Sequence, residues 1–67
     1  MILERARNRR VSRGWVLYGH PDHIGEAVPE NTVPRTNDWG KWFERWFPTE
    51  EKALGYATKK GWPVTFE

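Results

Sequence analysis

The chain lacks cysteine, which excludes disulfide bonds and any zinc site built on thiolates. It also lacks a long apolar run: no segment approaches the roughly 20 apolar residues that a membrane-spanning helix needs, and none has the core of a signal peptide. The one serine is Ser12, and no glycine-rich phosphate loop follows an expected strand. We therefore expect no membrane span, no catalytic residues, no cofactor and no metal, in a protein that is not an enzyme.

Large aromatic side chains are what the sequence has in excess. Five tryptophans, two tyrosines and three phenylalanines occur among 67 residues. A chain of this length forms one domain and buries only roughly 60% of its unfolded surface, so large rings are an efficient way to build its core. Tryptophan and tyrosine are also favoured at interfaces, and the ring count alone leaves both uses open.

Charge is distributed unevenly along the chain. The sequence has 11 basic and 9 acidic side chains, a formal net charge of +2. Residues 1–13 carry one carboxylate, Glu4, against five arginines: Arg5, Arg7, Arg9, Arg10 and Arg13. Apart from Ile2 and Leu3, which can start a short strand, this stretch has no apolar periodicity. We interpret residues 1–13 as an extended or flexible basic N-terminal arm and residues 14–67 as a single small α+β domain.

The basic arm allows three interpretations. It is a solvated tail, a contact for an acidic protein surface, or a contact for nucleic-acid phosphates, whose neutralisation supplies most non-specific affinity. An arginine-rich start that is nearly free of acid also suits a mitochondrial presequence. Together with the absence of cysteine, this predicts an intracellular protein, in a bacterial cytoplasm or on the matrix side of mitochondria.

The pattern of residues 15–37 predicts a short strand followed by a long loop. Residues 15–18 are rich in strand-forming types and lie between Gly14 and Gly19. The segment 19–37 exceeds the ~12–15 residues usual for a loop in a compact domain, and is either a binding loop or disordered. Within it, segment 20–23 holds two histidines and an aspartate, ligand types that suit zinc or iron. A proline stiffens this segment and the chain has no third histidine, so a turn is favoured over a metal site.

The segment 38–47 carries a dense run of rings that fits two structures. The rings at 39, 42, 43, 46 and 47 follow helical spacing, and Asp38 can cap a helix. Gly40 and Pro48 oppose a helix, and tryptophan and phenylalanine favour strands. We predict a strand here, with a helix as the alternative.

As a strand, the aromatic segment has two different sides. Alternate side chains point in opposite directions, which separates Trp42, Glu44 and Trp46 from Phe43, Arg45 and Phe47. One side can pack beneath a helix, so large rings stay exposed on the other, which is typical of an interaction surface. In the helical alternative the rings gather on one side and belong to the core. The candidate partner-binding residues are Trp39, Trp42, Trp46 and Arg45.

The next segment has the signals of a helix over residues 50–60. Thr49 is a natural N-cap, and the two glutamates that follow it favour the positive end of the helix dipole. Two lysines fall in the last turn, and Gly61 can adopt the left-handed conformation that ends a helix. Gly55 inside the helix costs roughly 1 kcal/mol relative to alanine, which suggests close packing against a neighbouring element.

A short strand is expected at the end of the chain, where residues 64–66 alternate after Pro63. We assign Trp15 and Trp62 to the core. The predicted fold class is α+β, a small antiparallel sheet of about three strands with one helix packed on one face. Its order along the chain is strand, loop, strand, helix, strand.

The last third of the chain also follows a family pattern. Its elements are Phe47, Thr49, Glu51, Ala53, Tyr56-Ala57, Lys59-Lys60-Gly61-Trp62 and Val64, with a weaker echo in Ala6-Arg7-Asn8, Ser12, Gly14 and Trp15-Val16-Leu17. Over these residues the chain resembles the accessory-subunit family of respiratory complex I known as the ETC complex I subunit conserved region. The resemblance implies a small antiparallel sheet with one helix across a face, no cofactor, and a non-catalytic role as a clamp or assembly factor on a larger complex.

Three functions are consistent with the sequence. The first is a non-catalytic protein-interaction module that docks on a larger assembly through the aromatic segment, the 19–37 loop and the basic arm. The second is a small phage-type regulator that inhibits a host protein. The third is a small basic nucleic-acid-binding protein whose arginines contact phosphates and whose rings stack on bases.

Overall fold

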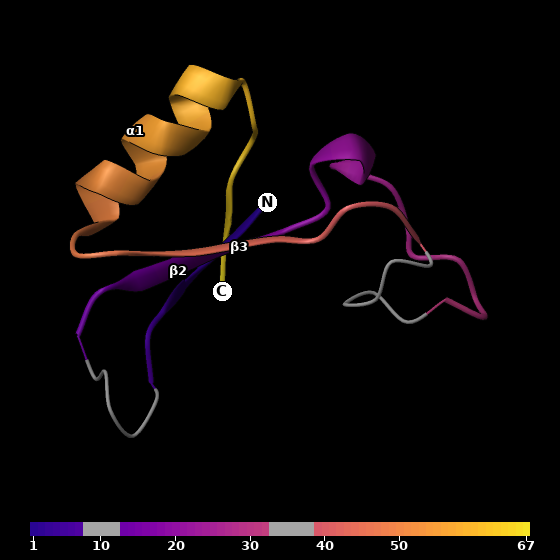
Figure 1. Ribbon diagram of the computed structural model, residues 1–67, viewed down its shortest axis with the longest axis horizontal. Coiled ribbons are helices and arrows are strands. Elements are labelled where there is room, and N and C mark those ends of the chain that lie inside the picture. The colour runs from indigo at the N-terminus through magenta and orange to yellow at the C-terminus, as the bar shows by residue number, and fades with distance from the viewer. Residues whose placement is uncertain (8–12, 33–38) are drawn as a thin grey trace.

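The computed structural model describes residues 1–7, 13–32 and 39–67. Within these ranges the chain forms, in order, β1 (Ile2–Arg5), β2 (Trp15–Gly19), the short 3-10 helix η1 (Pro21–His23), β3 (Phe43–Phe47), α1 (Glu50–Lys60) and β4 (Thr65–Phe66). The strands form one sheet, and α1 lies across one of its faces (Figure 1). The predicted α+β class, with one helix packed on one face, is confirmed.

The sheet has four strands in the order β3-β2-β1-β4. β2 pairs antiparallel with both β1 and β3, which gives the expected antiparallel arrangement for three of the strands. β4 adds a fourth strand, which pairs in parallel with β1 and places Thr65 opposite Ile2. The sheet is mixed because the chain passes from β3 to β4 through α1, a crossover rather than a hairpin.

The first strand differs most from the sequence interpretation. The sequence favours a basic arm over residues 1–13, with a short strand start at Ile2 and Leu3, whereas the structure extends that strand through Arg5 and places it between β2 and β4. The sequence does not reveal the full length of this strand. Glu4 and Arg5 are charged, and Leu3 is the one fully buried side chain of β1, so the strand shows no apolar periodicity. Beyond β1, the Ala6 amide donates to the Gly14 carbonyl oxygen at 3.0 Å and continues the pairing with β2.

The structure places part of the arginine set near this first pair of strands. Arg5 ends β1, and Arg7 and Arg13, which follow β1 and precede β2 in the chain, are exposed. Arg9 and Arg10 lie outside the residues that the structure describes.

The aromatic segment forms a strand over Phe43–Phe47, as predicted, and pairs with β2 along its whole length. Pro48 follows it directly and ends the pairing, since proline has no amide hydrogen to donate to a sheet. Phe47 is buried beneath α1, with its ring centroid 5.5 Å from that of Tyr56.

The helix has the bounds and caps that the sequence predicts. The Thr49 hydroxyl oxygen accepts a hydrogen bond from the Lys52 amide at 3.2 Å. Gly61 has φ of 76° and ends the helix in the left-handed conformation, and the Trp62 amide donates back to the Ala57 carbonyl oxygen at 2.8 Å. The close packing expected at Gly55 is wrong: this residue is exposed, and a β-carbon there would meet no atom within 4 Å.

The core lies between α1 and the sheet. Leu3 and Leu17 are 0% exposed and face the helix from the two central strands. Ala53 and Ala57, on the other side of the interface, are small enough to let α1 approach closely. Around this centre, half-buried rings seal the edges, and they include Trp15 and Trp62 as the sequence predicts.

The two ends of the described chain are held together through β1 and β4. The Thr65 amide donates to the Met1 carbonyl oxygen at 2.9 Å, and the Glu67 amide donates to the Leu3 carbonyl oxygen at 3.0 Å. The Met1 amino group donates to the Pro63 carbonyl oxygen at 3.0 Å, and desolvation by burial lowers the pKa of that amino group.

Candidate interaction surface

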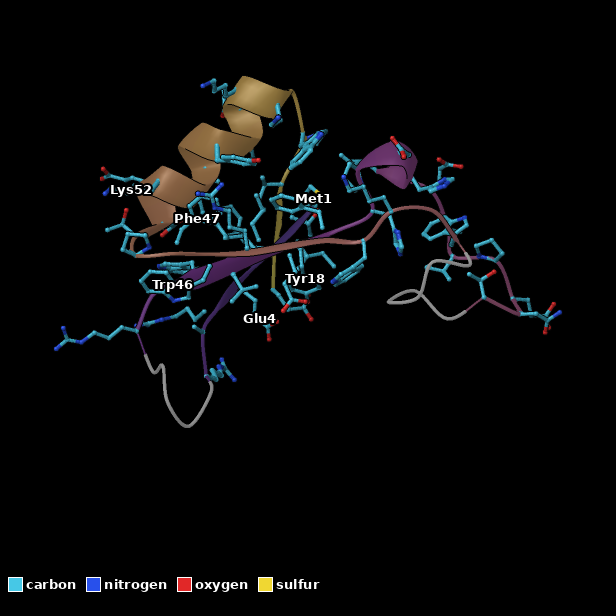
Figure 2. All side chains as sticks on the ribbon, in the orientation of Figure 1. Met1, Glu4, Tyr18, Trp46, Phe47 and Lys52 are labelled. Atoms are coloured by element: carbon cyan, nitrogen blue, oxygen red, sulfur yellow. The ribbon has the colours of Figure 1, made fainter. Side chains whose placement is uncertain are left out.

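The sheet has one face beneath α1 and one face that none of the described helices or strands covers. Side chains alternate along each strand, and the register decides which residues share the uncovered side. They are Ile2, Glu4, Val16, Tyr18, Glu44, Trp46 and Thr65, which we call the open face. In Figure 2, Glu4, Tyr18 and Trp46 lie on the side of the sheet away from α1, while Met1 and Phe47 lie on the helix side.

The open face is a regular grid of apolar and acidic side chains. In one row, Trp46 lies opposite Val16, which lies opposite Glu4. In the next row, Glu44 lies opposite Tyr18, which lies opposite Ile2. Because neighbouring strands are about 4.8 Å apart, each carboxylate of the grid has a ring or an aliphatic side chain directly beside it.

Trp46 is the most prominent ring of the open face. It is 46% exposed, yet its indole Nε1 donates a hydrogen bond to the Arg13 carbonyl oxygen at 2.9 Å. The ring also lies against Gly14, where a β-carbon would collide with the indole. The indole is thus fixed in orientation while nearly half of its surface remains exposed to water.

Trp42 immediately precedes β3 and lies on the same side of the chain as Glu44 and Trp46. Its ring centroid is 5.7 Å from that of Tyr18, and its indole Nε1 donates to the Glu44 carboxylate at 3.1 Å. Glu44 therefore lies between two indoles along β3 and beside a phenol on β2. The structure brings Trp42 and Trp46 to one surface, as their spacing in a strand predicts.

The basic residues of the strands lie on the opposite side of the sheet. The Arg5 guanidinium is 5.7 Å from the centroid of the Trp15 ring. The Arg45 guanidinium lies 5.5 Å from the Phe47 ring and 5.3 Å from the Tyr56 ring. Arg45 is therefore not part of the open face, and this candidate partner-binding residue is separated from Trp42 and Trp46. Arginines on one face and glutamates on the other give the sheet a charge asymmetry.

Trp39, the remaining candidate, belongs to a separate cluster beside η1. Its ring stacks on His23 with centroids 4.3 Å apart and planes 15° apart, and meets His20 edge-on at 5.0 Å. His20 in turn meets the Trp42 ring edge-on at 5.2 Å. These contacts tie η1 to the start of the aromatic segment, so Trp39 packs within the fold at one end of the sheet.

The turn predicted at segment 20–23 is present as η1. The His23 Nδ1 atom and the Glu26 carboxylate are 3.0 Å apart, and His23, Glu26 and Trp39 line part of a pocket of about 400 Å³. Within the described ranges no group of three or more histidine, cysteine or acidic side chains is placed to hold a metal ion. The 19–37 loop is described as far as Thr32, and its remaining residues lie outside the described ranges.

Several open-face residues were not singled out by the sequence analysis. Val16 and Tyr18 belong to β2, a strand that the sequence predicts. Which face of the sheet they share with other residues depends on how β2 pairs with β1 and β3, and a single sequence does not reveal that pairing. Glu4 was counted with the basic arm. One signal was available: Gly14 directly before an apolar strand is typical of a place where another group approaches the backbone closely.

No family model, curated protein or solved structure matches the chain. Of the helices in the described ranges, none has the length and apolar character to cross a membrane.

Proposed function

We propose that the chain is a non-catalytic protein-interaction module that docks on a larger assembly through the open face of its sheet. The observation that carries this proposal is Trp46, a half-exposed indole held in one orientation on a sheet face that no described element covers. Large rings of this kind are enriched among the residues that dominate binding energy at protein interfaces. The resemblance to the complex I accessory family supports the same role, as a clamp on a larger complex.

The charges of the open face favour a protein partner over a nucleic acid. Proteins that bind single-stranded nucleic acids combine stacking rings with a positively charged groove. Here the rings stand beside Glu4 and Glu44, and the strand arginines lie on the helix side. Carboxylates repel phosphates, so the open face does not combine the two features that stacking on bases requires.

A phage-type regulator would use the same surface on a host protein. The two roles share a mode of binding and differ in the identity of the partner. The complex I resemblance supports the accessory role, and identification of the captured protein distinguishes a respiratory assembly from a host enzyme.

The test is capture by the tagged chain from a native lysate of its source cells, with nuclease-treated and untreated halves washed at moderate salt. Trp46→Ser removes the anchor. Phe66→Ser is the matched control, because Phe66 is a 54% exposed ring that pairs with Leu3 and so lies on the helix side. We expect a discrete protein that both the original chain and the control retain, and a loss of at least about tenfold with Trp46→Ser.

Two results would contradict the proposal. Recovery that disappears with nuclease would show that the chain binds nucleic acid. Equal loss with both substitutions, in variants that remain folded by urea denaturation, would show that exposed rings bind non-specifically wherever they lie.

A further inference from the structure

We propose that β3 accepts an extended strand of the partner protein along its outer edge, so that the sheet gains a further strand next to Trp46. This inference rests on the proposed docking function and names the part of the partner that docks. It is drawn from the backbone of β3 and from the charges on its two sides.

The free edge of β3 is long and regular. β3 ends the sheet on one side, where no described strand pairs with it. It has 5 residues, against 2 in β4 at the other end of the sheet. Its register with β2 is continuous, without a bulge, and no proline lies inside it. Bulges, prolines and very short strands are common ways of protecting an edge, and β3 uses none of them.

Hydrogen bonds elsewhere in the sheet decide which backbone groups point toward β3. The Ala6 amide donates to the carbonyl oxygen of Gly14, which continues the register of β1 and β2. Residues that are directly opposite and hydrogen-bonded turn their backbone groups toward each other, so those of Gly14 point toward β1. The direction alternates along a strand, and the backbone groups of Leu17 therefore point toward β3.

Glu44 and Trp46 consequently present backbone groups to an incoming strand. Leu17 lies opposite Arg45, whose amide and carbonyl oxygen are turned toward β2. The same groups of Glu44 and Trp46 are turned away from the sheet, and no backbone hydrogen bond joins them to another described residue. The side chains of residues 44–46 are all exposed. An antiparallel strand placed here would form hydrogen bonds with both residues, as in peptide recognition by strand addition.

The charges beside the edge specify the side chains of the incoming strand. Directly opposite residues of two paired strands share a face of the sheet. The Arg45 guanidinium lies over the Phe47 and Tyr56 rings and forms no ion pair with a described carboxylate, so an acidic residue fits opposite it. A basic residue fits opposite Glu44, and an apolar one opposite Trp46, which is 46% exposed. In the partner's own direction the segment therefore reads apolar, acidic, basic.

A second copy of the chain fits this edge less well. In an antiparallel pair of copies, a two-fold axis at Arg45 would place this residue beside its own copy, and like charges directly opposite each other are destabilising. An axis at Glu44 would do the same with two carboxylates. An axis at Trp46 would bring Glu44 opposite Pro48, which has no amide hydrogen to donate. The edge thus favours a different chain with complementary charges.

The test uses a blocked peptide of threonine, valine, glutamate, lysine and valine, in that order. It places the first valine opposite Trp46, the glutamate opposite Arg45 and the lysine opposite Glu44. The comparison peptide exchanges glutamate and lysine, which keeps the composition and sets like charges beside each other. Binding is followed through the backbone amide resonances of the isotope-labelled full chain. We expect the Glu44 and Trp46 amides to move, and the exchanged peptide to bind about five- to tenfold more weakly.

N-methylation of the peptide tests the direction of its hydrogen bonds. A methyl group on the first valine or on the lysine removes an amide hydrogen that faces β3, whereas one on the glutamate removes an amide hydrogen that points away from it. Either of the first two should weaken binding by about tenfold, because the methyl group removes a hydrogen bond and obstructs the approach of the strands. The third should weaken it by less than about twofold, since no hydrogen bond to β3 is lost.

One substitution in the chain tests the charge at the centre of the edge. Arg45→Gln should weaken binding of the original peptide by about two- to fivefold, the range for exposed ion pairs, with a smaller loss at high salt. Lys59→Gln, at an exposed cation of α1, is the matched control and should change nothing. Equal losses in the two variants would reject the contact with Arg45.

The inference is overturned if the methyl group on the glutamate weakens binding as much as the one on the first valine, if the exchanged peptide binds equally well, or if no amide of β3 moves at the highest soluble peptide concentration. It is also overturned if the Glu44 and Trp46 amides move with the concentration of the chain alone, because a second copy would then occupy the edge.

The two proposals can fail separately. Protein capture that depends on Trp46, without any response to the peptide, would keep the docking function and reject the added strand. A response to the peptide without any captured protein would show an edge that accepts a strand and would reject docking on a larger assembly.

Discussion

The indole of Trp46 occupies the space that a β-carbon on Gly14 would need. Gly14 has φ of 90°, and an added β-carbon would also lie 2.6 Å from the Phe47 carbonyl oxygen. The glycine at the start of β2 thus permits two things at once, a left-handed backbone and the close approach of the ring on β3. The position of the exposed Trp46 ring on β3 therefore depends on the absence of a side chain at Gly14, directly before β2.

Gly14→Ala tests this dependence. The substitution imposes the strain of a left-handed residue, about 1–2 kcal/mol, and adds a collision with backbone that no side-chain rotation relieves. We expect a loss of unfolding free energy of at least about 2–3 kcal/mol in urea denaturation, together with a shift of the Trp46 indole resonance. The matched control is Gly25→Ala, because Gly25 has φ of 83° and an added β-carbon meets no atom within 4 Å. Equal losses in the two variants would reject the steric role of Gly14.

Gly55→Ala should stabilise the protein. Gly55 lies inside α1, its β-carbon would meet nothing within 4 Å, and its φ is not positive. Alanine lowers the conformational entropy of the unfolded chain, so we expect a gain of about 0.5–1 kcal/mol in the free energy of unfolding. Gly61→Ala, at the left-handed residue that ends the same helix, should instead destabilise by about 1 kcal/mol or more. A loss of stability with Gly55→Ala would mean that Gly55 packs closely against a neighbouring element, contrary to the structure.

Thr49→Ala removes the hydroxyl that accepts the Lys52 amide at the start of α1. Loss of an N-cap typically costs about 1 kcal/mol, and thermal or urea unfolding measures it. Thr58→Ala, at an exposed position within the same helix, changes the same side chain without removing a cap. It should be neutral or slightly stabilising, since alanine has the higher helix propensity. A smaller loss with Thr49→Ala than with Thr58→Ala would contradict the capping role.

Adjacent residues of β2 test which face is buried. Leu17 is 0% exposed beneath α1, whereas its neighbour Val16 points to the open face. Leu17→Ala should cost about 2–5 kcal/mol, enough to unfold much of a domain this small, and Val16→Ala about 1 kcal/mol or less. Urea denaturation of the two variants measures both values. Comparable losses would mean that both faces of the sheet are covered.

The sequence predicts those parts of the fold whose signals are local. The helix, its Thr49 cap and its Gly61 stop rest on neighbouring residues, and the structure confirms all three. The choice of a strand for the aromatic segment rests on Gly40, Pro48 and ring propensity together with the family resemblance, and the strand is also confirmed. The full extent of β1 and its parallel pairing with β4 depend on contacts between distant residues, which no local pattern in this chain encodes.

The candidate site could be predicted in part for the same reason. Alternation along one strand is local, so the sequence separates Trp42 and Trp46 from Arg45. The register places Trp46 and Arg45 on opposite sides, and Trp42 contacts Tyr18 and Glu44 of the open face. Glu4 and Tyr18 join the open face through pairing with neighbouring strands, which sequence periodicity alone does not give. Trp39 was grouped with the other tryptophans by proximity in the chain, whereas its contacts are with His20 and His23.

The pairing of Ile2 with Thr65 has a consequence for how the chain folds. Residues from the two ends of the sequence must meet before the edge strand exists, and closing a loop of that size is entropically unfavourable. Contacts so distant in sequence slow folding relative to helical proteins of the same length. During synthesis on the ribosome, β1 and β2 emerge long before β4, so the sheet cannot be completed until β4 has left the exit tunnel.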